Sequence, residues 1–392
     1  MAEETNKVRK KNHFLRNVCI LLIAFLLADH FLGWGVAYYI RDTISEYRIS
    51  EISDSQPPEA VETVSTEKYA YSTLDDETKQ VYDQVLDAIL SYEEDYAVST
   101  TDKGVLDKAY SCVMADYGNL FWQNGYSYEI YSVEDDVRRI LFTPTYIMTR
   151  DEKEAYEAQI ENAIPEFLEG TDAAASDYDK AKSVFERLIT MVDYDTASEN
   201  NQNIISTFIG RSTVCQGYAC AVNVLFDRLG LQACIVTGNA TSEPHALNLV
   251  RLDGEYYYMD VTWGNGSYYT NDDALNATIN YAYLNFTSED LNRYFTPTGT
   301  YTLPECTATA DNYYHREGLY FDSFDTIGIG SALARGYTGE SRIATIRLSD
   351  HELMDQVREY FITNHHISDT CYGLRSYSYL VDDNWNIITV IF

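Results

Sequence analysis

The stretch that decides the fold is Val214–Leu229, which reads VCQGYACAVNVLFDRL. Its apolar spacing predicts a short helix, and Gly230 directly after it is typical of a helix end. Cys215 would open this helix, where unpaired N–H groups and the helix dipole stabilise a thiolate. Cys215 is therefore a candidate nucleophile, although a single cysteine in an apolar helix is more often a buried core residue.

Three strand-like segments follow the helix, at Gln232–Thr237, Ala246–Leu252 and Tyr256–Thr262. Asp253-Gly254, between the last two, is a strong signal for a two-residue hairpin. An antiparallel pair brings the start of one strand beside the end of its partner, so we expect His245 near Asp260. His245 would act as a base toward Cys215, and Asp260 would hold the tautomer of His245.

Each of these residues alone is weak evidence for catalysis. His245 could have a purely structural role, and Asp260 could cap the end of the hairpin. The order Cys, His, Asp on helix, strand and strand is what favours a catalytic triad. The backbone N–H of Cys215 is the natural first oxyanion donor. Four neighbouring residues are candidates for substrate or oxyanion support: Gln216, Gly217, Asn248 and Trp263. Gly217 is expected to leave the first helical turn open to a substrate backbone. For the other three, packing or an outward orientation is the alternative.

Several blocks of sequence resemble the transglutaminase-like core of bacterial exported proteins. They are Val214–Ala219, His245–Asn248, Asp253–Tyr257 and Met259–Trp263, with weaker likeness at Asp116–Trp122. The resemblance is strongest over about 178–290 and looser over 70–320. It implies a papain-like cysteine-catalysis fold, with Cys215 as nucleophile, His245 as base and Asp260 as orienter. Leu247 stands where the family usually has Trp, which leaves the substrate preference open.

The predicted fold class is α+β, with a helix carrying Cys215 packed on an antiparallel sheet carrying His245 and Asp260. Helices are predicted at Asp75–Tyr92, Gly104–Tyr117, Glu152–Leu168 and Tyr178–Val192, and a strand at Arg138–Met148. A small α/β module closes the chain, with a strand at Ile343–Leu348, a helix at His351–Thr363 and a hairpin of Ser376–Leu380 with Ile387–Ile391. The predicted divisions are a cytoplasmic tail 1–17, a transmembrane signal-anchor 18–40, a linker 41–66, a helical lead-in 67–175, a catalytic core 176–317 and a C-terminal module 318–392.

The N-terminal region contains an apolar run, Val18–Ile40, that is long enough to span a bilayer. Basic residues precede it, so the positive-inside rule places the N-terminus in the cytoplasm and the bulk of the chain outside. We therefore expect a single-pass protein of the cell membrane. A cleaved signal peptide with its apolar region at Val18–Ala28 is the alternative.

Composition excludes several classes of protein. The 392 residues include 61 acidic and 28 basic side chains, a net charge of -33, so nucleic-acid binding is disfavoured. Seven cysteines are too few for a disulfide scaffold, and no pair has metal-ligand spacing. We expect no metal and no cofactor. His365-His366 lacks neighbouring ligands and is predicted to lie on the surface.

Two functions remain open at this point. The first is a cell-surface thiol enzyme that acts on amide bonds of a protein or peptide substrate, with substrates associated with the cell wall among the candidates. If water resolves the acyl-enzyme, the protein is a peptidase or amidase, which we favour slightly. If a lysine amine resolves it, the protein is a crosslinking transglutaminase. The second is a catalytically silent module that binds cell-wall glycan or protein through the 35 Tyr side chains.

Overall fold

A computed structural model describes residues 68–133, 136–265 and 279–392. The predicted cytoplasmic tail, signal-anchor and linker, residues 1–66, lie outside the described residues. Within the described ranges, no helix is both long and apolar enough to cross a membrane.

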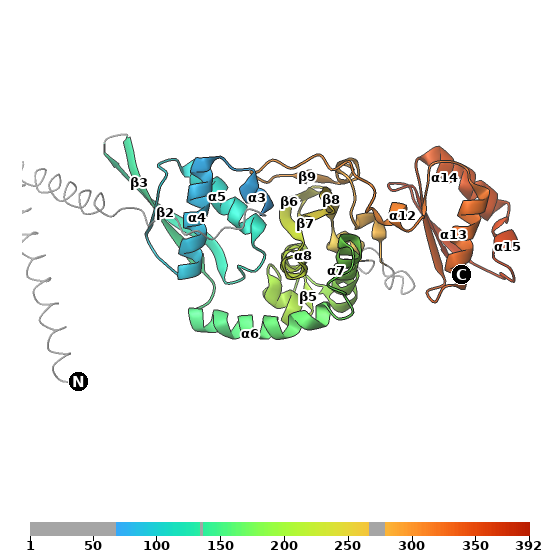
Figure 1. Cartoon of the computed structure of the whole chain (residues 1–392), viewed down its shortest axis with the longest axis horizontal. Helices are drawn as coiled ribbons and strands as arrows, with labels where there is room; N and C mark the ends of the chain where they lie inside the picture. Colours follow the sequence, from blue (N-terminus) through green and yellow to red (C-terminus); the bar gives the residue numbers. More distant parts are fainter. Residues whose placement is uncertain (1–67, 134–135, 266–278) are drawn as a thin grey trace, which may run out of the picture. The chain divides into compact units, whose positions relative to one another are not determined.

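The lead-in region combines helices with a small antiparallel sheet of order β1-β3-β2 (Figure 1). The predicted helices are confirmed as α4 (Asp76–Ser91), capped by the Asp75 side chain, and α5 (Lys103–Asp116). Strand β3 (Asp136–Tyr146) was predicted, but β2 (Gln123–Val133) was not. Most β2 side chains are at least partly exposed, so its sequence lacks the apolar run that predicts a buried strand. The remaining elements are α3 (Tyr69–Ser72) and β1 (Tyr96–Val98).

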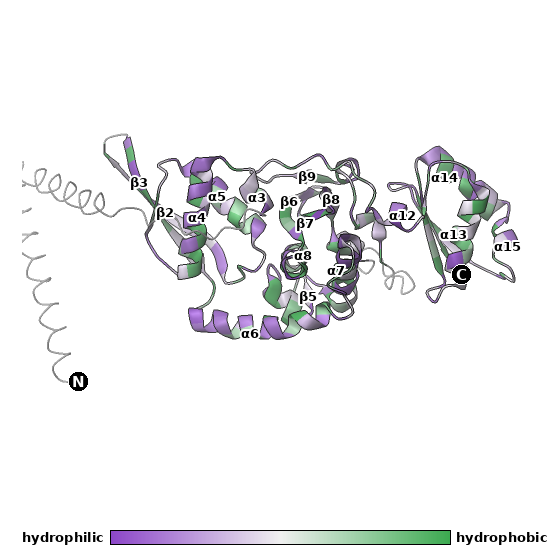
Figure 2. Cartoon of the chain, viewed as in Figure 1, coloured by the Kyte–Doolittle hydropathy of each residue, from purple (hydrophilic) through white to green (hydrophobic). Residues whose placement is uncertain are grey.

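Two helices lead from this region to the nucleophile helix. α6 (Arg150–Phe167) begins with a capping box between Thr149 and Glu152. Its buried side chains lie near its C-terminal end, and Figure 2 shows the rest of the helix as mainly hydrophilic. α7 (Asp177–Met191) is capped by Ser176, whose side chain accepts a hydrogen bond from the Asp179 N–H.

The central sheet has the order β8-β7-β6-β9, and all its neighbouring strands are antiparallel. Asp253 (φ 48°) and Gly254 (φ 91°) form the predicted tight turn between β7 and β8. The predicted last strand was too long, because β8 ends at Met259 and a short helix follows. Helix α8 packs against β6 and β7 (Figure 1). The bounds are β6 (Gln232–Ala240), β7 (Glu243–Leu252), β8 (Glu255–Met259), β9 (Phe295–Pro297), α8 (Cys215–Leu229) and α9 (Val261–Gly264).

The C-terminal module is a sheet of order β10-β11-β13-β12 with helices packed on it. The predicted strand, helix and closing hairpin are all present, and the helix ends in a π-helical turn at Arg358–Thr363. Helix α13 (Thr326–Thr338) was not predicted. A side chain at its Gly336 would lie 2.4 Å from the Ala344 side chain, so glycine permits close packing on β11. The bounds are β10 (Tyr320–Phe321), β11 (Ile343–Leu348), α14 (His351–Val357), α15 (Ile367–Thr370), β12 (Ser378–Asp382) and β13 (Ile387–Ile391).

Buried apolar side chains form two clusters. One extends from the lead-in region through the central sheet, and the other fills the C-terminal module. Trp385 and Ile387, which belong to the closing hairpin of the module, are members of the first cluster. The module therefore contributes side chains to the core that surrounds the central sheet.

Candidate active site

Cys215 is the first residue of α8, and the loop before it is fixed by short strands. β5 (Ser212–Thr213) pairs in parallel with β4 (Asp193–Tyr194), and the Thr213 side chain donates a hydrogen bond to the Asn201 carbonyl at 3.1 Å. The residue before the helix is Val214, which has no polar side chain, so no side chain caps the helix. The N–H groups of the first turn thus remain available to a negatively charged group beside Cys215.

Cys215 differs from the other cysteines of the described ranges in its accessibility. It is partly exposed, whereas the remaining five are buried, and all six are free thiols. Burial raises the pKa of Cys112 and Cys220 to about 12 and that of Cys306 to about 11. Since a thiolate is the nucleophilic form, these buried cysteines are poor nucleophiles, and Cys215 is the accessible thiol of the described residues.

His245 and Asp260 lie close together at one end of the central sheet. His245 is near the start of β7, opposite Gly238 of β6, and Asp260 directly follows β8. His245 Nε2 is 2.7 Å from Asp260 Oδ2, and Asp260 is fully buried. Cys215 lies close enough to His245 to contribute to the raised pKa of the imidazole. Because Nε2 faces Asp260, Nδ1 is the ring nitrogen available to the thiol.

The surroundings of His245 favour its protonated form. Burial alone lowers the pKa of His245, but the charge and hydrogen bond of Asp260, with a further contribution from Cys215, outweigh this effect. Together they raise the pKa of His245 from its ordinary value of 6.5 to about 10. An imidazolium at this position can donate a proton to a reacting group.

Asp260 is held by groups other than His245. Its Oδ1 accepts a hydrogen bond from the Trp263 N–H at 3.0 Å, which makes Asp260 the cap of α9. Its Oδ2 also accepts a hydrogen bond from the Tyr294 hydroxyl at 3.1 Å. The same carboxylate therefore caps α9 through Oδ1 and contacts His245 through Oδ2, so both of its oxygens have hydrogen-bond partners.

Aromatic rings flank His245. The edges of Trp263 and Phe295 meet its ring at centroid distances of 6.2 and 6.1 Å. A side chain at Gly238, the cross-strand neighbour of His245, would lie 2.4 Å from the Phe295 ring, so glycine is needed there. Trp263 was predicted to lie beside His245, whereas Tyr294 and Phe295 were not. Both come from a later segment, and no local pattern links them to His245.

Two of the predicted support residues are buried, which contradicts the expectation for Gly217 and agrees with the packing alternative for Asn248. Gly217 was expected to leave space for a substrate, but it is buried, and a side chain there would lie 1.9 Å from Thr213 Oγ1. Its role is to let α8 pack on the preceding loop. Asn248 is buried, and its amide donates to the Ala219 carbonyl at 3.0 Å. It joins β7 to α8 and is not open to a substrate.

The side chains of Gln216 and Leu247 contact neighbouring elements of the fold. The Gln216 amide lies 3.5 Å from the Cys220 sulfur, so the side chain runs along α8. Leu247 is buried and faces Val236 across the strand pair. Within the described ranges, no group of three or more Cys, His, Asp or Glu residues is arranged to hold a metal ion.

Residues 166–261, which include Cys215, His245 and Asp260, match the transglutaminase-like superfamily. The resemblance noted from the sequence is thus confirmed for this part of the chain. No curated protein matches the chain.

Three solved structures resemble parts of the chain. One is a TGase, with 15% identity and a TM-score of 0.27 over 40% of this chain and 47% of that one. The second is a candidate cysteine protease from Cytophaga hutchinsonii, with 15% identity, a TM-score of 0.23 and coverage of 35% and 62%. The third is a candidate protease from Parabacteroides distasonis, with 8% identity, a TM-score of 0.22 and 36% of each chain. The chain spans less than two thirds of each, and likeness at this level carries no argument about activity.

Proposed function

We propose that this chain, which carries a transglutaminase-like domain over residues 166–261, is a thiol enzyme that acts on amide bonds of proteins or peptides. Cys215 is the nucleophile, His245 the acid and base, and Asp260 the residue that orients His245. The proposal is carried by one observation, the buried His245 whose ring is 2.7 Å from the Asp260 carboxylate and whose pKa is raised by Asp260 and Cys215 together. Such an arrangement supplies an activated nucleophile and a positioned proton carrier.

The proposed reaction begins when the Cys215 thiolate attacks the carbonyl carbon of the amide. The carbonyl oxygen becomes an oxyanion, which the N–H groups at the start of α8 stabilise. The His245 imidazolium then gives its proton to the departing amine, and the C–N bond breaks. This leaves an acyl group on Cys215 and a neutral His245.

A second nucleophile completes the turnover. Neutral His245 takes a proton from water as the water attacks the acyl-enzyme, which releases a carboxylic acid and restores the thiolate–imidazolium pair. A lysine amine in place of water would give a crosslinked product by the same steps. We favour water slightly, because no sequence feature marks a dedicated site for an amine.

The test uses a library of peptides containing glutamine, together with a labelled primary amine. Cleavage or deamidation without incorporation of the label supports the hydrolase, and incorporation supports the crosslinking enzyme. Cys215→Ala serves as the blank for both products. The proposed enzymatic function is rejected if the wild-type chain forms neither product from any peptide and if wild type and Cys215→Ala bind cell-wall material equally well.

The alternative, a silent binding module, relied on tyrosines as a recognition surface. Many tyrosines of the described residues are instead in the core, including Tyr82, Tyr218, Tyr257 and Tyr258. The exposed ones are Tyr128 in the lead-in region and Tyr372 and Tyr379 in the C-terminal module. The tyrosine content thus favours a structural role over a binding surface.

The proposal extends to the location and organisation of the chain. Residues 18–40 are proposed to anchor it in the cell membrane, with residues 1–17 in the cytoplasm and the catalytic part outside. The division into a linker (41–66), lead-in (67–175), catalytic core (176–317) and C-terminal module (318–392) belongs to the same proposal. Recovery of the mature chain in soluble form, with an N-terminus beyond residue 28, would rule out the anchor.

A further inference from the structure

The turn between β12 and β13 places a tryptophan of the C-terminal module in the core of the catalytic part. Asp382 accepts hydrogen bonds from the Asn384 and Trp385 N–H groups at 3.0 and 3.2 Å, which fixes the turn. Trp385 is 3% exposed and belongs to the cluster around the central sheet, while most of the module packs in a cluster of its own. Its side chain is therefore shared with the neighbouring core.

Trp385 connects to Asp260 in two steps. Its indole N–H donates to the Tyr283 hydroxyl at 3.1 Å, and its ring meets Tyr283, Phe286 and Tyr294 at centroid distances of 4.9, 6.0 and 6.4 Å. Tyr294 in turn donates its hydroxyl to Asp260 Oδ2. Tyr283 also packs on the Tyr294 ring at 5.4 Å, so the rings form one continuous group beside the site.

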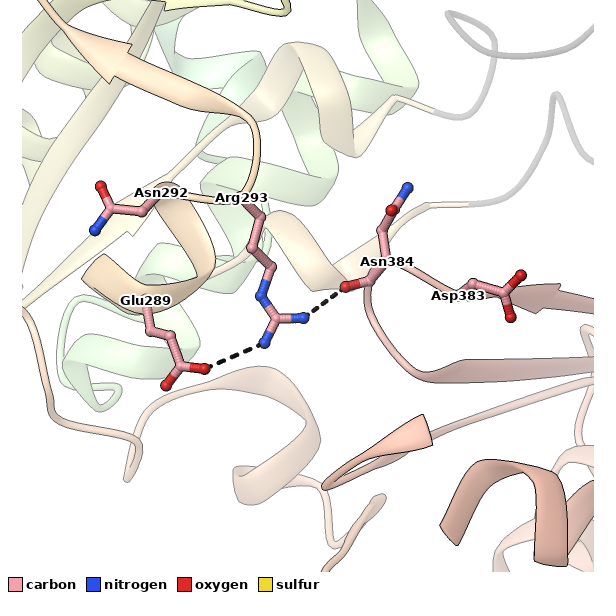
Figure 3. A pocket seen from close by; sticks show the side chains of 5 residues that line it. All are labelled: Glu289, Asn292, Arg293, Asp383 and Asn384. Carbon is pink, nitrogen blue, oxygen red and sulfur yellow. Dashed lines mark hydrogen bonds and ion pairs between the residues drawn. The ribbon is translucent and has the colours of Figure 1, made fainter. Parts of the chain in front are cut away.

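Charged residues fix this contact from two sides. Arg347 of β11 makes two hydrogen bonds to Asp290 of α11 (Ser288–Leu291), at 2.5 and 3.3 Å, and both side chains are largely buried. Its guanidinium lies 5.2 Å from the centre of the Trp385 ring. On the other side, Arg293 donates to the Asn384 carbonyl at 2.5 Å and also pairs with Glu289 (Figure 3). The position of Trp385 is thus set by directional bonds as well as by packing.

We propose that Trp385 is a positioning residue for the Cys215 site and acts through Tyr294. The proposal rests on the proposed thiol chemistry. Tyr294 can hold Asp260 Oδ2 only while its ring stays in place, and Trp385 closes the side of the ring group that faces the module. The C-terminal module is therefore part of the active-site scaffold. Its removal or loosening would affect the chemical step, although no residue of the module touches the reacting atoms.

The test is a double-mutant cycle on the full-length chain, with Trp385→Ala, Tyr294→Phe and the combination, and with kcat and KM measured separately. We expect Trp385→Ala to lower kcat about threefold to fivefold, no more than Tyr294→Phe does, and to leave KM within about twofold. In the Tyr294→Phe background, the same change should lower kcat by less than about twofold, because the route to Asp260 is already cut. Trp385→Phe, which keeps an aromatic ring, should recover most of the activity.

Val390→Ala is the matched control, since Val390 is a buried residue of the same hairpin that packs in the module's own cluster. It should lower the melting temperature but leave kcat unchanged. Equal losses from Trp385→Ala in both backgrounds, or an equal loss from Val390→Ala, would overturn the route through Tyr294. An active wild-type chain with unaltered Trp385→Ala kinetics rejects the inference alone. A wild-type chain whose Cys215 reacts no faster than that of His245→Ala rejects the proposed function, and the inference with it.

Discussion

Two histidine–aspartate pairs in this molecule have the same contact distance but different surroundings. His245 and Asp260 in the central sheet are 2.7 Å apart, and so are His366 and Asp369 in the C-terminal module. The side chains of the first pair are 6% and 0% exposed, whereas those of the second are 42% and 71% exposed. His366 was expected on the surface, and it stacks there on Tyr360.

The two pairs have the same contact distance, so burial and neighbouring groups, and not distance, determine how strongly each histidine and aspartate interact. Water screens an exposed pair, which typically contributes about 0–1 kcal/mol. A buried pair keeps its electrostatic coupling, and removal of one partner leaves an uncompensated charge. His245 also contacts a thiol at the start of a helix. The predictions below probe this difference between the two pairs.

The largest expected effect comes from the thiol. Cys215→Ala should lower turnover by about 1,000-fold or more, since the covalent route is lost. The fold should persist, because the side chain is only partly buried. Peptide turnover and melting temperature measure the two properties. Cys371→Ala is the control in the region of the exposed pair, and it should keep full turnover. Residual activity in Cys215→Ala above about a tenth of wild type contradicts the assignment.

The aspartates are compared through the same substitution. Asp260→Asn should lower kcat about 100-fold or more, because the amide favours the wrong tautomer of His245 and removes the charge that stabilises the imidazolium. Asp369→Asn, with an identical change in chemistry, should leave kcat within about twofold. Steady-state kinetics on both variants decide the matter. Equal effects of the two substitutions would remove the distinction between the pairs.

The pH dependence of stability gives a smaller effect. The folded-state pKa of His245 is raised to about 10, so the protonated pair stabilises the fold fully below pH 6.5, and this contribution declines as the pH rises to about 10. We expect it to be on the order of a few kcal/mol at pH 6. Urea unfolding of wild type and His245→Gln from pH 6 to pH 10 measures the difference, which should shrink with rising pH. A difference that is constant or grows with pH contradicts the raised pKa. His366→Gln should show little difference at any pH.

The smallest effect is expected at the hydroxyl that supports Asp260. Tyr294→Phe removes one donor to Oδ2 while keeping the ring, and should cost about 1 kcal/mol of stability. The kcat should fall only a fewfold, since His245 and the Trp263 N–H still hold the carboxylate. Denaturant unfolding and kinetics measure both. Tyr360→Phe, next to the exposed pair, is the matched control. A larger loss than that of Asp260→Asn would show that Tyr294 does more than support the carboxylate.

Local patterns predicted the part of the fold that carries the site. Gly230 and the apolar spacing predicted the end of α8, and Asp253-Gly254 predicted the hairpin that brings Asp260 back toward His245. These features act over a few residues, so a sequence displays them directly. The helices α4 and α7 were predicted from the same kind of local pattern.

The parts that were missed depend on contacts between distant segments. Tyr294 lies 34 residues after Asp260, and Trp385 lies 102 residues after Tyr283. No periodicity or turn signal specifies such pairs. Gly217 was misjudged because its role depends on the neighbouring Thr213 side chain, which a helical pattern does not place. Tertiary packing thus decided the surroundings of a site whose main residues the sequence had indicated.

The central claim, that His245 activates Cys215, is tested most directly by alkylation of the native full-length chain with iodoacetamide at pH 7. The adduct is located by mass spectrometry, and its rate of formation is compared between wild type and His245→Ala. Among the six described cysteines we predict an adduct at Cys215 alone, formed about tenfold or more faster in wild type, because the other five are buried and Cys215 interacts electrostatically with His245. Equal rates in the two proteins, or modification of another cysteine before Cys215, would contradict the account.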